Sequence, residues 1–125
     1  MLDVAKVVFY PQYFDLAHRF FEESWQHICA IDYPTLTLEM KVGFPAVRTE
    51  GEHLAPLRYG DEIVCTLWIE KVGDKSCTWR YKFANQNGLQ VWDGRVITVC
   101  VDLDTFESMS IPSELADSLR ACSED

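Results

Sequence analysis

Hydrophobic residues recur at helical spacing near the start of the chain. Five of them follow one another at intervals of three or four positions: Phe14, Ala17, Phe21, Trp25 and Ile28. Leu16 and Phe20 widen this apolar face, so that little polar surface remains. The proline at position 11 suits the first turn of a helix, where its missing N–H loses no intrahelical hydrogen bond. The pattern predicts a largely buried helix from residue 11 to residue 28, and a short second helix is expected at residues 34–41.

Later segments change to a period of two, which is typical of strands with one buried face. Every second residue is apolar in residues 62–71, EIVCTLWIEK, and again in residues 76–83, SCTWRYKF. Further strands are expected from Pro45 to Leu54 and from about Leu89 to Asp102. The connecting sequences KVGDK and ANQNG carry the Gly, Asn and Asp that tight turns need. The last three strands are therefore predicted to form an antiparallel meander.

These elements predict a single α+β domain over residues 1–125, in which an antiparallel sheet wraps around one long helix. The sequence SIPSELADSLRAC adds a short C-terminal helix, because Pro112 and Glu114 suit its first turn. Four long strands are few for enclosing a helix, so sheet edges and apolar surface are left over. A second copy of the chain would cover them most simply, and a homodimer or a homotetramer is expected.

The charge of the chain limits its partners. A formal net charge of -9 argues against nucleic acids and anionic membranes, because both bind basic surfaces. An anionic small molecule needs only a local basic group, and residues 58–82 concentrate five lysines and arginines: Arg58, Lys71, Lys75, Arg80 and Lys82. No apolar run approaches the roughly 20 residues that span a bilayer, and no signal pattern opens the chain. A cytoplasmic location is expected.

Several kinds of catalytic site are not indicated. The five cysteines form no CxxC pair, and Cys65 and Cys77 share the phase of the apolar residues of two predicted strands, so they are interpreted as small core residues. His18 and His27 would face opposite sides of the first helix and could not share a metal ion. The GxSxG, Walker, GxGxxG and HExxH signatures are missing. Neither a metal site nor a cofactor is expected.

The opening of the chain carries a more specific motif. The sequence DVAKVVFYPQYFDLAHRFFEESW resembles the D-x-x-G-[IV]-V-[FWY]-Y-P-x-Y opening of the 4-hydroxybenzoyl-CoA thioesterase family of hotdog-fold enzymes. The segments LAPLRYGDEI, KVGDKSCTWRYKF and VCVDLDTFESMSIPSEL continue the resemblance, which covers nearly the whole chain. Two departures stand out: Lys6 replaces the family's glycine, and only two residues precede Asp3. Either the start of the given sequence is internal, or the first strand of the hotdog fold is missing, and the fold is expected to lack this strand as the sequence stands.

The resemblance implies an acyl-CoA thioesterase that releases a free acid and coenzyme A. Matched to the motif, Asp3 is the catalytic aspartate, and Tyr10 supplies the backbone N–H that holds the thioester carbonyl. A helix N-terminus can stabilise a developing oxyanion while a nearby carboxylate attacks the thioester or activates water. Both roles of Asp3 remain open. The alternative is a domain that binds acyl thioesters or a protein partner without hydrolysing them, with Asp3 a mere terminal acid.

Further residues are candidates for binding the acyl-CoA substrate. His18 takes the place of a helix acid in related sequences and is expected to line the acyl pocket and contact a polar group on the substrate, although a core or interface role is the alternative and the commoner one for a histidine on an apolar helix. Lys75 and Ser76, with Arg58 as a less certain neighbour, match the part of the family that approaches the nucleotide. Glu22 and Glu23 are alternative helix carboxylates. The aromatic residues of the first helix suit an aryl or medium-length acyl group, or ordinary core packing.

Overall fold

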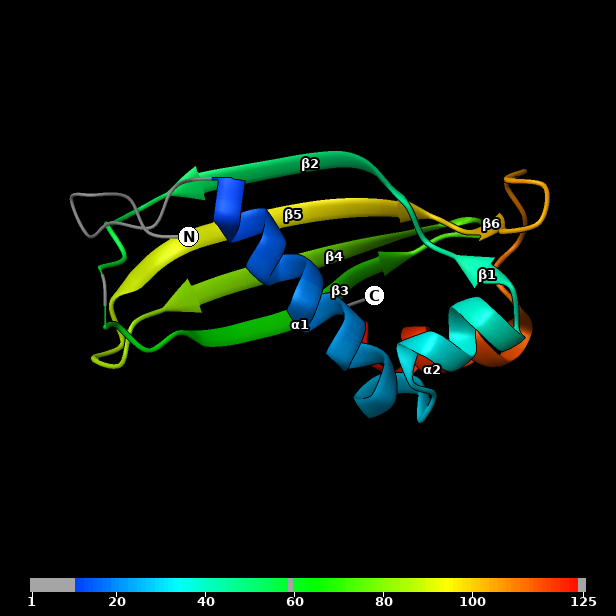
Figure 1. The fold of residues 1–125 in the computed structure, drawn as a ribbon, viewed down its shortest axis with the longest axis horizontal. Helices are drawn as coiled ribbons and strands as arrows, with labels where there is room; N and C mark the ends of the chain where they lie inside the picture. Colours follow the sequence, from blue (N-terminus) through cyan, green and yellow to red (C-terminus); the bar gives the residue numbers. More distant parts are fainter. Residues whose placement is uncertain (1–10, 59, 124–125) are drawn as a thin grey trace.

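The longest helix of the protein crosses one face of a four-stranded antiparallel sheet (Figure 1). The computed structural model describes residues 11–58 and 60–123. The helix, α1 (Pro11–Cys29), confirms the prediction over residues 11–28 and extends it by one residue. It ends where Ala30 adopts a positive φ of 55°, a left-handed conformation that commonly terminates helices.

One face of α1 is buried against the sheet. Its buried side chains, each at most 4% exposed, are those of Tyr13, Ala17, Phe21 and Trp25. Leu16 and Phe20 are only half-buried, and Asp15, His18 and Arg19 are exposed. The prediction of a helix with little polar surface is therefore wrong for this single chain, in which one side of α1 remains open.

The main sheet has the strand order β2-β5-β4-β3. Its strands are β2 (Ala46–His53), β3 (Val64–Val72), β4 (Ser76–Ala84) and β5 (Gln90–Val99), and a separate small sheet pairs β1 (Val42–Gly43) with β6 (Val101–Asp102). Strands β3, β4 and β5 form the predicted meander, and β2 pairs with β5 on the other side. The strands predicted at residues 45–54, 62–71 and 76–83 are thus confirmed as β2, β3 and β4, with shifts of one or two residues at their ends.

The prediction of one strand from Leu89 to Asp102 is wrong in one respect, because the structure divides this segment into β5 and β6 at Cys100. The backbone N–H of Cys100 donates a hydrogen bond to the carbonyl of Lys75 at 2.7 Å, and its carbonyl accepts one from the N–H of Met109 at 2.9 Å. These bonds to two other segments direct the chain away from β2 and toward β1.

Two short helices lie at the same end of the molecule as the small sheet (Figure 1). The first, the π-helix η1 (Thr35–Glu39), confirms the helix expected at residues 34–41. A side-chain oxygen of Asp32 accepts a hydrogen bond from the N–H of Thr35 at 2.8 Å, and hydrogen bonds from the side chain and the backbone of Thr35 lower the pKa of Asp32. The second, α2 (Ser113–Ala121), is the predicted C-terminal helix.

Aromatic rings fill the space between α1 and the sheet. Trp25 packs against Phe44 and Trp79, with ring centroids 4.8 and 5.6 Å apart, and Phe21 meets the edge of Trp79 at 4.9 Å. All four side chains are at most 5% exposed. This cluster anchors the C-terminal half of α1 and fixes the position of the sheet beneath it.

A second aromatic cluster lies under the N-terminal half of α1. Tyr13 stacks on Trp92 with centroids 5.7 Å apart, and the Trp92 indole lies against Gly51 and Gly94. These two glycines face each other across β2 and β5. A Cβ atom at either position would overlap the indole ring, so the close approach of Trp92 requires glycine on both strands.

The opposite face of the sheet is polar. Arg80 forms ion pairs with Glu70 and Asp93, both at 3.0 Å, and Arg95 forms a second pair with Glu70 at 2.8 Å. Hydrogen bonds from the two arginines lower the pKa of Glu70. The Arg80 guanidinium also lies over the Trp68 ring, 5.4 Å from its centroid. Apolar ligands are therefore expected on the helix side of the sheet.

Candidate functional site

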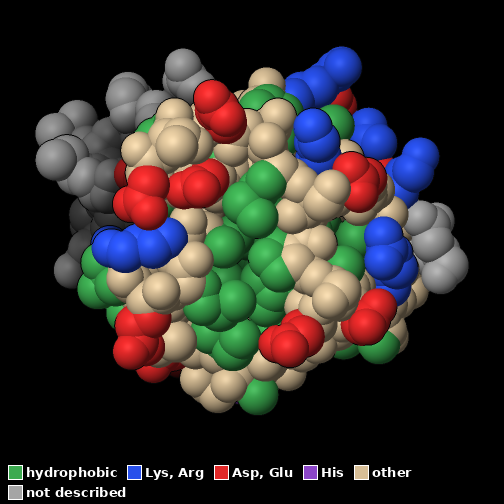
Figure 2. All heavy atoms as spheres, turned by 90° about the vertical axis from the view of Figure 1, so that its right-hand side faces the viewer, with side chains coloured by type: hydrophobic (Ala, Val, Ile, Leu, Met, Phe, Trp, Pro, Cys, Tyr) green, Lys and Arg blue, Asp and Glu red, His purple; other side chains and the backbone are tan. Residues whose placement is uncertain are grey.

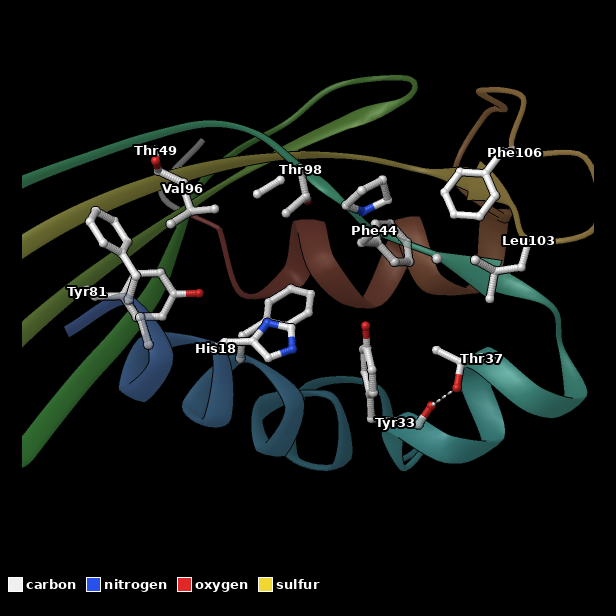
Figure 3. A pocket seen from close by; sticks show the side chains of 16 residues that line it. His18, Tyr33, Thr37, Phe44, Thr49, Tyr81, Val96, Thr98, Leu103 and Phe106 are labelled. Atoms are coloured by element: carbon white, nitrogen blue, oxygen red, sulfur yellow. Dashed lines mark hydrogen bonds between the residues drawn. The ribbon is translucent and has the colours of Figure 1, made fainter. Parts of the chain in front are cut away.

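An apolar groove runs between α1 and the inner face of the sheet, with a volume of about 370 Å³. Side chains of α1, η1, β2, β4 and β5 line it, together with the loop after β6. Figure 3 shows the two strands β2 and β5 on one side of the groove and the two helices on the other. This volume lies within the roughly 300–1,000 Å³ that is typical of small-molecule sites.

The walls of the groove are mainly aromatic and aliphatic. Phe14 and Phe21 come from α1, Val96 comes from β5, and Leu103 and Phe106 close the end farthest from the start of α1 (Figure 3). Among the lining residues that the structure describes, there is no Asp, Glu, Lys or Arg. The groove therefore suits a neutral apolar group rather than a charged one.

The end of the molecule formed by β1, β6, η1 and α2 carries apolar surface as well. Figure 2 shows hydrophobic side chains gathered near the middle of this face, with acidic side chains around them. Phe106, in the loop after β6, is 68% exposed and adopts a positive φ of 61°. This left-handed conformation is uncommon for a bulky residue, and it presents the ring at the end of the groove.

Two threonine hydroxyl groups along the groove are already engaged. The hydroxyl of Thr98 accepts a hydrogen bond from the indole N–H of Trp79 at 3.0 Å and donates one to the carbonyl of Cys77 at 3.4 Å. The hydroxyl of Thr37 donates to the carbonyl of Tyr33 at 3.1 Å. These threonines shape the groove, but their hydroxyls are held by the protein itself.

Two phenol groups point into the cavity, those of Tyr33 and Tyr81 (Figure 3). Burial raises the pKa of Tyr33, and the nearby Glu22 raises it further. The pKa of Tyr81 is also raised, mainly by burial. Both phenols are therefore neutral near pH 7 and can donate as well as accept a hydrogen bond.

His18, a residue predicted to bind the substrate, lies in the lining of the groove and is exposed on α1. Its ring stacks on Phe21 with centroids 5.7 Å apart and meets the edge of Tyr33 at 6.4 Å. Its Nε2 atom is 3.7 Å from a carboxylate oxygen of Glu22. The position is compatible with a contact to the acyl group, and that contact remains a prediction.

The predicted catalytic pair, Asp3 and Tyr10, lies outside the described residues. Tyr10 immediately precedes α1, and Phe14 of the first helical turns lines the groove. The alternative helix carboxylates are elsewhere, because Glu22 and Glu23 border a separate depression beside Pro34 and do not line the groove.

The three residues predicted to approach the nucleotide do not lie together. The backbone N–H of Arg58 donates to Asp61, which is hydrogen bonded to Gln86 at the β4–β5 turn. Lys75 and Ser76 lie at the other end of β4, in the β3–β4 turn. The nine residues of β4 separate the two places by roughly 30 Å. The structure does not bring Arg58 to the same anion as Lys75, and none of the three residues lines the groove.

The cysteines give no sign of nucleophilic chemistry. Burial raises the pKa of Cys65 and of Cys77 to about 12, and that of Cys100 to about 11. Thiols with such pKa values remain protonated and unreactive near pH 7, which agrees with a core role.

Within residues 11–58 and 60–123, no three metal-ligating side chains come together. None of the helices described has both the length and the apolar character needed to cross a membrane.

Sequence reasoning missed several lining residues, among them Tyr33, Phe44, Tyr81 and Phe106. The alternation in β4 does place Tyr81 on the inner face, in phase with Trp79, but nothing in it shows that the hydroxyl reaches a cavity. Tyr33 and Phe106 lie in connecting segments whose course depends on contacts between distant parts of the chain.

The comparisons with known proteins all indicate the same family. The sequence model of the thioesterase superfamily matches residues 5–91. The 1,4-dihydroxy-2-naphthoyl-CoA hydrolase of Prochlorococcus marinus (strain NATL2A) is 29% identical over 119 residues, covering 90% of this chain and 76% of that protein. Its counterpart in strain NATL1A is 27% identical over 119 residues, covering 90% of this chain and 79% of that protein.

Solved structures show the same architecture. A thioesterase superfamily protein from Jannaschia sp. CCS1 superposes with a TM-score of 0.90 at 23% identity, covering 98% of this chain and 85% of that one. The gentisyl-coenzyme A thioesterase BH1999 superposes with a TM-score of 0.82 at 25% identity, covering 94% of this chain and 90% of that one. The hotdog fold expected from the opening motif is therefore confirmed.

Proposed function

The chain belongs to the thioesterase superfamily, and on this premise we propose that it hydrolyses an aryl-CoA thioester to the free acid and coenzyme A. The observation that supports this most directly is the groove along α1, whose walls are aromatic and whose lining has no charged Asp, Glu, Lys or Arg among the residues described. The relatives named as hydrolases of 1,4-dihydroxy-2-naphthoyl-CoA point to the same class of substrate.

In the proposed reaction the thioester carbonyl lies at the start of α1 and the acyl group extends along the groove. The backbone N–H of Tyr10, together with the positive end of the helix dipole, stabilises the oxyanion that forms at this carbonyl. Asp3 either attacks the carbonyl carbon or removes a proton from the attacking water. Collapse of the intermediate breaks the carbon–sulfur bond, and the departing thiolate of coenzyme A takes up a proton. Where water attacks, this step gives the free acid directly; where Asp3 attacks, it leaves a mixed anhydride on Asp3, which a water molecule then hydrolyses to the free acid and the regenerated carboxylate.

We further propose that the working form is a homodimer or a dimer of dimers. All eight residues of β2 are exposed in the single chain, and this strand pairs only with β5 among the strands described. An open strand edge of this length offers unpaired N–H and C=O groups that a second copy can cover. A second copy of the chain would also cover the side of α1 that remains open next to the groove.

The proposal is tested with the variant Asp3→Asn and a panel of aryl-CoA and aliphatic acyl-CoA thioesters. We expect the wild-type protein to hydrolyse aryl thioesters preferentially, and Asp3→Asn to lower kcat by roughly 10²- to 10⁴-fold, the usual contribution of a positioned acid or base. Asp15→Asn is the matched control, because Asp15 is an exposed acid of α1 outside the groove. Its kcat should be unchanged.

Two results would contradict this proposal. An Asp3→Asn variant as active as the wild type would remove Asp3 from the mechanism. Thioester binding without hydrolysis of any member of the panel would instead favour the alternative of a binding domain that lacks catalysis.

A further inference from the structure

The phenol of Tyr81 occupies an unusual position in the groove. Tyr81 lies in the middle of the central strand β4, between Leu67 on β3 and Gly94 on β5. Its side chain is 1% exposed, yet it lines the groove and directs its hydroxyl into the cavity (Figure 3). The other inward aromatic residues of β4, Trp79 and Phe83, are instead packed against the rings of α1.

The hydroxyl of Tyr81 is not engaged by the part of the protein that the structure describes. Within residues 11–58 and 60–123, no group forms a hydrogen bond with it. The buried hydroxyls of Ser24 and Thr98 are satisfied within the protein: Ser24 donates to the carbonyl of Phe21 at 2.7 Å, and Thr98 accepts from the indole N–H of Trp79 at 3.0 Å. Buried tyrosine hydroxyls normally find a partner, since leaving one unpaired in an apolar site is unfavourable. A hydroxyl that faces a cavity without a partner is available to a ligand.

The surroundings restrict what that ligand group can be. The lining of the groove has no described Lys or Arg that could neutralise a carboxylate, and no described Asp or Glu that could accept from an ammonium group. A charged substituent would therefore be buried without compensation. A neutral phenol can both donate and accept, so hydroxyl and carbonyl oxygens are the groups that fit it.

We propose that Tyr81 is a specificity-determining residue, whose hydroxyl forms a hydrogen bond with a neutral oxygen substituent on the acyl group. The inference rests on the proposed function, because it states what the same groove recognises. Substrates that carry the oxygen satisfy Tyr81, whereas unsubstituted substrates place apolar atoms against its hydroxyl and leave it without a partner in the apolar groove. Because an unpaired buried hydroxyl is unfavourable, we expect kcat/KM to be on the order of 10- to 100-fold higher for substrates that carry the oxygen than for unsubstituted ones.

The test compares benzoyl-CoA with its three monohydroxylated isomers on the full chain. The wild-type protein should prefer at least one hydroxylated isomer, and Tyr81→Phe should abolish most of that preference, mainly by lowering kcat/KM for the hydroxylated substrate. Tyr13→Phe is the control, because Tyr13 is a buried phenol that hydrogen bonds to the backbone of Leu57 and does not line the groove. It should retain the preference of the wild type, and melting temperatures verify that both variants are folded.

A second measurement separates this inference from the proposed function. Calorimetry with phenacyl-CoA thioethers, with and without ring hydroxyls, reports binding to a protein that cannot cleave them. If no thioester is hydrolysed, the proposed function fails, but a hydroxyl preference in binding that Tyr81→Phe removes still supports the inference. The inference is overturned if the wild type shows no preference in either assay, if Tyr81→Phe keeps the preference, or if no analogue binds.

Discussion

The buried hydrogen bond between Trp79 and Thr98 offers a direct test of what holds the groove in shape. Trp79 is fully buried and Thr98 is 2% exposed, and the indole N–H donates to the threonine hydroxyl at 3.0 Å. Thr98→Val keeps the shape of the side chain but removes the acceptor. Because water cannot reach the indole N–H, we expect the free energy of unfolding to fall by about 1–3 kcal/mol. For a chain of 125 residues, this corresponds to a decrease in Tm of roughly 4–12 °C.

Urea denaturation followed by circular dichroism measures this change, and Thr98→Ser is the matched control. Serine keeps the hydroxyl and loses one methyl group, so its cost should be near 0.8 kcal/mol. A double-mutant cycle with Trp79→Phe then isolates the bond: once the indole N–H is gone, Thr98→Val should be nearly neutral. The reasoning is refuted if Thr98→Val costs the same in the presence and in the absence of the indole N–H.

Two further predictions concern stability. Gly94→Ala places a methyl group against the Trp92 indole and should lower the free energy of unfolding by about 1–3 kcal/mol, as measured by urea denaturation. Adding Trp92→Phe to the same chain should partly relieve this loss, because the smaller ring leaves room for the methyl group. Burial raises the pKa of Cys65 and Cys77 to about 12, whereas the ordinary value is 9.0, so unfolding releases protons between these values. The free energy of unfolding should therefore decrease as the pH rises above about 9, and replacing both cysteines by alanine should flatten this alkaline slope.

The main elements could be predicted from the sequence because each carries its own local signal. The helical spacing of apolar residues and the proline at position 11 place α1 within one residue of its observed end, and the alternation in residues 76–83 places β4. The division between β5 and β6 has no such signal. It depends on the hydrogen bond that the N–H of Cys100 donates to the carbonyl of Lys75 and on the one that the carbonyl of Cys100 accepts from the N–H of Met109, and these partners become neighbours of Cys100 only in the folded chain.

The site was predicted less completely, and for the same physical reason. His18 was proposed because it matches the position of a helix acid in related sequences; it does lie in the lining of the groove, and its contact with a substrate stays a prediction. The resemblance grouped Arg58 with Lys75, but the intervening strand β3 carries the chain from one end of the sheet to the other between these two residues. Tyr33 and Phe106 lie in connecting segments that border the groove, and the courses of these segments are set by tertiary contacts.

The two faces of β4 explain why the groove can be neutral in a strongly charged protein. Alternation along the strand directs Trp79 and Tyr81 toward α1 and Arg80 toward the other face. There Arg80 is committed to Glu70 and Asp93, so its charge is compensated on the outer face of the sheet and does not reach the groove. The central basic stretch of the sequence therefore cannot be interpreted as one anion site. Part of it stabilises the sheet from outside, and this leaves the inner face to apolar walls and to phenols that recognise neutral oxygen.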